Sequence, residues 1–387
     1  MITFACEIQK KELVMNKQIV PITLLTGYLG SGKTTLVNNI LANKSGLKIA
    51  VIVNDIGEVN VDASLIQKGG IVNQEDDSLV ALSNGCICCT LKTDLIKQIT
   101  DITETNRFDY IVIEASGICE PVPIAQTITA MSEMSSRFMI PEICRLDCVV
   151  TVVDALRMAK EFSCGDDLDK KNIDNEDIEN LLIQQIESCN VIVMNKIDEI
   201  GTDELNRLRT VIKKLQPSAE IIETNYSKFD LDKIIDSKRF NFQKASASAG
   251  WIEELEKDEE EREEGETEEY GISTFVYYRR EPFSLNKFDW YANSEWPKNI
   301  IRSKGVAYFE ENPEMSYLFE QAGTQKKLTE AGQWLCTAPK ADQERMLEQS
   351  AELRKDWDEK YGDKMIKIVF IGRDMDKEKI CAELDNI

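Results

Sequence analysis

The chain has 387 residues, 11 cysteines and no histidine, and its formal charge is −23. This length allows two or three domains with buried cores, and the negative charge opposes binding to nucleic acid. Scattered cysteines, with neither a signal peptide nor an apolar run of about 20 residues, predict a soluble, cytoplasmic protein with no membrane partner. Without histidine, any metal has to be held by thiolate, carboxylate or neutral oxygen.

Apolar, β-rich runs alternate with helical patterns from residue 19 to about 224. The runs are almost continuously apolar, which indicates a parallel sheet covered on both faces. The alternation therefore predicts an α/β doubly wound, nucleotide-binding fold. The expected strands are 19–26, 47–54, 110–115, 148–155, 190–196 and 219–224.

The stretch from Gly27 to Thr34 reads GYLGSGKT and matches the phosphate-binding pattern G-x-x-x-x-G-K-[ST]. It lies between the first expected strand and a helical run, which is the context that this motif requires. Its glycines let successive N–H groups point at phosphates, and the helix N-terminus adds partial positive charge. We therefore expect Lys33 to reach the β- and γ-phosphates and Thr34 to bind Mg²⁺.

Two further segments follow strands and carry acidic residues. Glu114 stands at the carboxyl end of a strand, where it can hold the Mg²⁺ shell or a water, and Gly117 can present its N–H to the γ-phosphate. Capping of the next turn is the alternative role for Glu114. The segment 54–65, NDIGEVNVDASL, is predicted to be a second mobile loop that brings Asp55 and Glu58 near the phosphates or a metal. Solvation of a surface loop is the alternative for both.

The sequence NKID at residues 195–198 follows another buried strand. An aspartate here can accept hydrogen bonds from both N1–H and the exocyclic amine of guanine, whereas adenine offers no such pair of donors. Asn195, Lys196 and Asp198 therefore predict that the nucleotide is GTP rather than ATP.

The sequence NGCICCTL places Cys86, Cys88 and Cys89 within four positions. Buried structural cysteines and a redox pair of Cys86 with Cys89 are two interpretations. We favour the third, metal capture, because closely spaced thiolates suit a soft or borderline ion, Zn²⁺ above all. Three thiolates leave one tetrahedral position for water, for a carboxylate such as Glu58, or for a group on a receiving protein.

Residues 253–269 are acidic at 12 of 17 positions, and such a run repels itself. We expect an N-terminal extension at 1–18, a P-loop domain at 19–240, an acidic linker at 241–270 and a smaller α+β domain at 271–387. In the last domain the patterns predict strands at 271–280, 300–309, 315–323, 332–338 and 365–372, and helices at 284–293, 341–357 and 376–384.

Together these motifs resemble those of the CobW-type GTP-dependent metallochaperones, which include cobalamin-biosynthesis CobW proteins and zinc-handling GTPases. The resemblance rests on GYLGSGKTTL, NDIGEVNVD, NGCICCTL, EASGICEP and NKID, and it extends to GISTFVYYRREPF and YGDKMIKIVFIG near the C-terminus. It implies a slow GTPase that binds Zn²⁺, Co²⁺ or another divalent ion and releases it to a client protein on GTP hydrolysis. Carried onto this sequence, the family's sites fall on Gly30, Ser31, Gly32, Lys33, Thr34 and Thr35 for phosphate, Cys86, Cys88 and Cys89 for metal, Glu114 for the switch, and Asn195, Lys196 and Asp198 for guanine.

One departure from the family concerns the segment before the C-terminal domain, where many members carry a histidine-rich stretch and this chain is acidic. A regulatory GTPase switch, or an insertase for cobalt or another metal, with cysteines that are only structural, is the alternative function. A P-loop small-molecule kinase is a further alternative function. The protein is also a possible homodimer. We expect GTP and Mg²⁺ to order 54–65 and 114–120, and thereby to couple nucleotide state to metal affinity.

Overall fold

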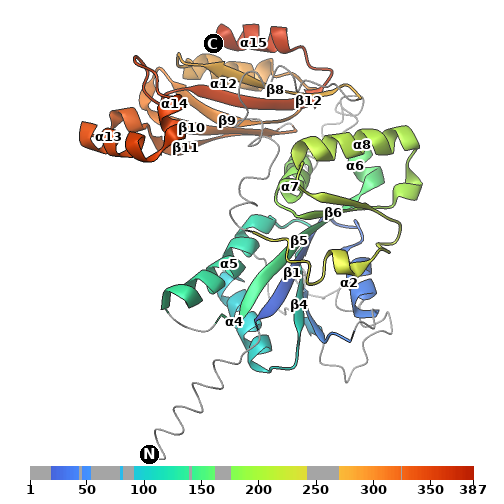
Figure 1. Ribbon diagram of the computed structural model, residues 1–387. Coiled ribbons are helices and arrows are strands. Elements are labelled where there is room, and N and C mark those ends of the chain that lie inside the picture. Colours follow the sequence, from blue (N-terminus) through green and yellow to red (C-terminus); the bar gives the residue numbers. More distant parts are fainter. Residues whose placement is uncertain are drawn as a thin grey trace, which may run out of the picture. The chain divides into compact units, whose positions relative to one another are not determined.

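Figure 1 shows the computed structural model of the chain. It describes residues 19–42, 46–53, 79–81, 91–138, 142–161, 176–241, 270–323 and 325–387. The chain divides into two compact units, one around a parallel sheet and one around an antiparallel sheet. Within the described ranges, no helix has both the length and the apolar character that crossing a membrane requires.

The first unit is built on seven parallel strands in the order β3-β2-β4-β1-β5-β6-β7, which confirms the predicted α/β sheet. All six expected strands are present, although β5 begins at Cys144 rather than at residue 148. The extra strand, β3, has only three residues, too few for a pattern to reveal. The strands are β1 (Val20–Thr26), β2 (Ile49–Val53), β3 (Leu79–Ala81), β4 (Tyr110–Glu114), β5 (Cys144–Asp154), β6 (Val191–Asn195) and β7 (Glu220–Glu223).

Helices cover both faces of this sheet. On one face, α2 packs with Leu231 and Ile234 over the side chains of Val51, Val112 and Val150. On the other face lie α4 and α5 (Figure 1). Between residues 33 and 233 the helices and 3₁₀ turns are α2 (Lys33–Ala42), α4 (Leu91–Glu104), α5 (Pro121–Phe138), α6 (Ala155–Glu161), α7 (Glu176–Glu187), η1 (Ile197–Glu199), α8 (Thr202–Leu215) and η2 (Leu231–Lys233). Most of α7 and α8 groups with the second unit.

The second unit is built on five antiparallel strands in the order β11-β10-β9-β12-β8. Two helices, α12 and α15, lie on one face of this sheet (Figure 1), where their apolar side chains meet an aromatic cluster that includes Phe275, Phe319 and Phe370. The elements are β8 (Ile272–Arg279), α12 (Leu285–Ser294), β9 (Ile300–Phe309), β10 (Asn312–Ala322), β11 (Gln325–Gln333), η3 (Leu335–Thr337), α13 (Lys340–Gln349), α14 (Ala351–Lys355), β12 (Ile366–Arg373) and α15 (Lys377–Asp385).

Two expectations for this unit were wrong. The strand expected at 332–338 lies earlier, as β11, and residues 335–337 form the turn η3. The carboxylate of Asp363 accepts from the N–H groups of Leu335 (2.7 Å) and Cys336 (2.8 Å), and takes the place of a neighbouring strand. The helix expected at 341–357 is two helices, because Ser350 adopts an extended conformation between them.

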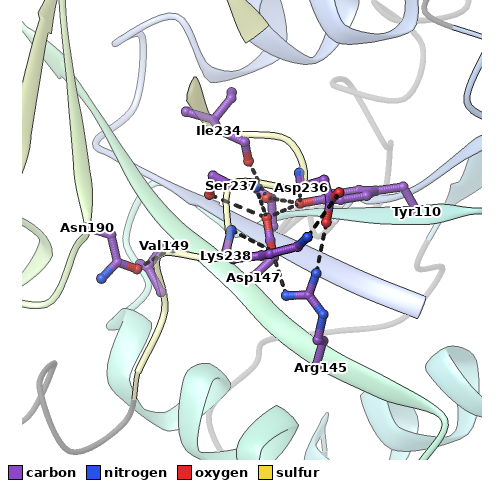
Figure 2. A network of polar contacts seen from close by, with 10 residues as sticks. Tyr110, Arg145, Asp147, Val149, Asn190, Ile234, Asp236, Ser237 and Lys238 are labelled. Carbon is purple, nitrogen blue, oxygen red and sulfur yellow. Dashed lines mark hydrogen bonds and ion pairs between the residues drawn. The ribbon is translucent and has the colours of Figure 1, made fainter. Parts of the chain in front are cut away.

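A buried polar network anchors the segment after β7 to the amino end of the first sheet (Figure 2). Its centre is Asp147 on β5, whose side chain is fully buried. The carboxylate accepts from the hydroxyl of Tyr110 at 2.7 Å and from the main-chain N–H groups of Ser237 (2.8 Å) and Lys238 (3.0 Å), and it pairs with Arg145 at 2.6 Å. Burial and the charge of Asp147 both raise the pKa of Tyr110, so the phenol stays protonated as the donor.

Replacing Asp147 by alanine should destabilise the first unit by about 3 kcal/mol or more, because several buried donors lose their acceptor at once. Urea unfolding of the full chain, followed by far-UV circular dichroism, measures this. The urea transition followed by tryptophan fluorescence should shift less than the one followed by circular dichroism. The described tryptophans all lie in the second unit: Trp290, Trp296, Trp334 and Trp357.

The matched control is Asp236→Asn, which weakens the outer ion pair of Arg145. The side chain of Asp236 is 55% exposed, and exposed ion pairs contribute about 1 kcal/mol or less. Equal effects of the two substitutions would contradict a central role for Asp147.

Candidate nucleotide site

The phosphate-binding loop between β1 and α2 is pressed against two neighbouring strands. Gly27 has φ 130° and Gly32 has φ 111°, in the region that favours glycine. A Cβ atom on Gly27 would lie 2.2 Å from the carbonyl oxygen of Val152, and one on Gly32 would lie 2.3 Å from Nδ2 of Asn195. The glycines of the motif are therefore required by close packing as well as by backbone conformation.

The polar residues of the first turn of α2 face the loop and β4. The ammonium group of Lys33, which is buried, donates to the carbonyl of Gly27 at 2.8 Å. The hydroxyl of Thr34 donates to Oε1 of Glu114 at 3.1 Å, and Thr35 is exposed on the same turn. A hydroxyl oxygen and a carboxylate oxygen are ligands of the type that Mg²⁺ prefers, and these two lie close together, so Thr34 and Glu114 fit such an ion.

The segment after Glu114 lies against the phosphate-binding loop. A Cβ atom on Gly117 would lie 2.7 Å from the backbone nitrogen of Leu29, so only glycine allows this approach. Gln185 on α7 is fully buried, and its Nε2 donates to the carbonyl of Cys119 at 3.2 Å. A helix side chain thus fixes the segment that the sequence predicts to sense the γ-phosphate.

Asn195 joins the phosphate-binding loop to the turn after β7. Its Nδ2 donates to the carbonyl of Ser31 at 2.9 Å, and its Oδ1 accepts from the N–H of Ser227 at 3.0 Å. Asn39 on α2 holds the same turn, because its Nδ2 donates to the carbonyl of Ser227 at 2.8 Å. The side chain of Asn195 is buried. This buried amide therefore holds the phosphate-binding loop and the turn after β7 together.

The other two residues of the expected guanine motif lie at the carboxyl end of β6. Lys196 adopts a left-handed conformation (φ 61°), and its ammonium group lies 2.5 Å from Oδ2 of Asp154. Asp198 is exposed, and its backbone N–H donates to Oδ1 of Asn225 at 3.2 Å. The carboxylate of Asp198 is thus on the surface, where a base could meet it.

The sequence motifs missed several residues that the structure brings to this edge: Asp154, Asn39, Asn225, Ser227 and Gln185. For Asp154 a signal existed, because it ends a central strand, and ligands bind outside the carboxyl ends of parallel strands. The others belong to no motif, and only the fold reveals their partners.

Five of the expected site residues lie outside the described residues: Asp55, Glu58, Cys86, Cys88 and Cys89. The part of the chain that the structure describes contains no group of three or more cysteine, aspartate or glutamate side chains placed to hold a metal. The roles assigned to all the site residues stay predictions.

Comparison with known families gives two matches that together span most of the chain. Residues 21–223 match the CobW/HypB/UreG nucleotide-binding domain, and residues 272–387 match the cobalamin synthesis protein CobW C-terminal domain. A zinc-regulated GTPase metalloprotein activator 1 of Dictyostelium discoideum is 36% identical over 95% of this chain and 79% of its own length. A zinc chaperone CobW of Sinorhizobium is 37% identical over 50% of this chain and 55% of its own length.

Solved structures give weaker likenesses. The Zn(II)-bound YjiA GTPase of Escherichia coli aligns over 95% of this chain and 99% of its own, with 19% identity and a TM-score of 0.41. HypB of Helicobacter pylori, in complex with nickel, aligns over 62% of this chain and 93% of its own, with 17% identity and a TM-score of 0.35. Both TM-scores are below 0.5, so we infer nothing about the site from them.

Replacing Asn195 by alanine should weaken the binding of GDP and of a GTP analogue by roughly 10- to 100-fold, because two buried hydrogen bonds between the loops are lost. Titration of a fluorescent GDP analogue measures the affinity. Asn293→Ala is the control, because this exposed amide donates to Asp289 on its own helix, far in sequence from the motif residues. Unchanged affinity in Asn195→Ala would show that the two loops hold together without it.

Proposed function

Because the chain belongs to the CobW/HypB/UreG family and is a GTPase, we propose that it is a metallochaperone that carries a divalent metal ion, zinc by preference, to a client protein. The observation that carries this proposal is the similarity over 95% of the chain to a zinc-regulated GTPase metalloprotein activator. The hydrogen bond from Thr34 to Glu114 supports its nucleotide-dependent part, because it links the phosphate-binding motif to the segment that begins at the end of β4. The names of two relatives, a zinc-regulated GTPase metalloprotein activator and a zinc chaperone, support zinc as the cargo. In this proposal Cys86, Cys88 and Cys89 hold the ion.

The nucleotide would be bound by groups already near one another. Lys33 would exchange the carbonyl of Gly27 for β- and γ-phosphate oxygens, a short movement because the two sites adjoin. Thr34 and Glu114 would hold Mg²⁺, which when bound neutralises charge on the phosphates. Gly117, against Leu29, would present its N–H to the γ-phosphate, and Asp55 would approach from the other loop.

Hydrolysis would be slow without a partner. The chain has no histidine to act as a base, so the attacking water has to be oriented by a carboxylate, by the backbone or by the substrate phosphate. Glu114 is the best placed of the described carboxylates, because its oxygen already contacts the P-loop threonine. A client that orders these loops would raise the rate, as partners do for other P-loop GTPases.

Coupling to the metal follows from the order of the segments in the chain. The thiol motif lies in the sequence between the 54–65 loop and Glu114. If both segments close on the γ-phosphate, the chain on each side of the thiol motif changes position with the nucleotide state. Metal affinity and nucleotide state are then linked reciprocally. The fourth ligand would be water, Glu58 or a group on the client.

Asp198→Asn should shift the nucleotide preference from GTP toward xanthosine triphosphate (XTP). The amide no longer accepts both guanine donors, whereas its N–H can donate to the C2 carbonyl of xanthine. We expect GTP affinity to fall about 100-fold, or 2.7 kcal/mol, and XTP to bind better than in the wild type. Competition of both nucleotides against fluorescent GDP measures this, with Asp203→Asn on α8 as the control; an unchanged GTP/XTP ratio would remove Asp198 from the base site.

Zinc affinity should be higher in the GTP-analogue form than in the GDP or nucleotide-free forms, by about tenfold for a coupling of about 1.4 kcal/mol. Competition with a fluorescent chelator measures it. Serine at positions 86, 88 and 89 should abolish tight binding and leave GDP affinity intact. Equal zinc affinities in all three forms would refute the coupling, and tight zinc binding by the triple-serine protein would refute the site.

A further inference from the structure

Asp154 is an acidic residue at the carboxyl end of β5 that belongs to none of the sequence motifs of the nucleotide site. Its side chain is 16% exposed, and Oδ2 lies 2.5 Å from the ammonium group of Lys196, which is 31% exposed. The other oxygen, Oδ1, accepts from the backbone N–H of Arg157 at 3.1 Å. The carboxylate therefore caps the first turn of α6 with one oxygen and holds a lysine of the expected base motif with the other.

The same helix start is tied to the phosphate-binding loop. The guanidinium group of Arg157 lies 4.1 Å from the centroid of the Tyr28 ring, at stacking distance. Tyr28 is the second residue of the loop. Asp154 thus stands between the base motif on one side and the phosphate-binding loop on the other, and its rotamer is fixed by the cap.

We propose that Asp154 is a positioning residue for guanine binding, which acts through Lys196. This inference rests on the proposed base site. A free lysine stem samples many rotamers, and fixing it in one of them costs conformational entropy. The partly buried carboxylate fixes the ammonium group beforehand, so that the methylene stem is held in one position and can cover the face of the base. Asp154 itself touches no nucleotide atom in this proposal.

A purely structural role, in which Asp154 only caps α6, makes a different prediction. Asp154→Asn keeps the Oδ1 acceptor for Arg157 and so keeps the cap. It turns an amide N–H₂ toward the Lys196 ammonium group, where no hydrogen bond can form between two donors. Asparagine should therefore leave the stability of the protein unchanged and disturb only Lys196.

The test is a double-mutant cycle in the full chain, with GDP affinity as the readout. Asp154→Asn and Lys196→Met, which keeps the stem and removes the charge, should each weaken GDP about tenfold. The double variant should be no weaker than the weaker single one. In Asp154→Asn the KM for GTP should rise about tenfold while kcat stays within about twofold. Lys233→Met, which removes an ion pair with Glu220 elsewhere in this unit, is the matched control.

The outcomes distinguish a failure of the positioning role of Asp154 from a failure of the proposed base site. Two outcomes would overturn the positioning role without affecting the proposed base site. One is a loss of GDP affinity in the double variant that equals the product of the two single losses. The other is normal GDP affinity in Asp154→Asn together with weakened GDP binding in Lys196→Met. Normal GDP affinity in Lys196→Met, together with an unchanged GTP/XTP ratio in Asp198→Asn, would overturn the base site itself. Thermal melting of each apo variant within about 1 °C of the wild type shows that the fold is intact.

Discussion

The side-chain amide of Asn195 binds both loops from which the nucleotide site is made. Each loop is irregular, so its backbone groups need partners outside regular structure. The amide donates to the carbonyl of Ser31 and accepts from the N–H of Ser227, and both bonds are buried. Gly32 completes this contact, because any side chain there would collide with the same amide. The Asn of the base motif and the second glycine of the phosphate motif are therefore one packing unit, although 163 residues separate them in the chain, from 32 to 195.

The two ends of the parallel sheet are built differently. At the amino end, Asp147 is surrounded by donors that satisfy it, and the cluster pins Ser237 and Lys238 in place. At the carboxyl end, the polar groups of Lys33 and Asp198 meet backbone or solvent, in positions where a ligand could replace those partners. This division agrees with the general rule that parallel α/β sheets bind ligands outside the carboxyl ends of their strands.

Most of the fold could be predicted from the sequence, because buried parallel strands are continuously apolar and because GYLGSGKT and NKID carry their own structural context. The failures share a cause. The strand β11 reads QKKLTEAGQ and is largely exposed, so its pairing with β10 leaves no apolar period to recognise. The turn at Leu335 depends on Asp363, which lies 28 residues away. In the site, Gln185 and Asp154 act through partners that are distant in the chain, so no local motif could have identified them.

The described cysteines help to define where a metal could bind. Burial raises the pKa of Cys144, Cys148 and Cys189 to about 12, and burial also raises the pKa of Cys336 and Cys381 in the second unit. Metals bind the thiolate, so a raised pKa increases the cost of the deprotonation that zinc binding requires. Burial therefore disfavours metal binding at these five thiols, and the proposed cargo site uses three other cysteines, those of NGCICCTL, which are close together in sequence.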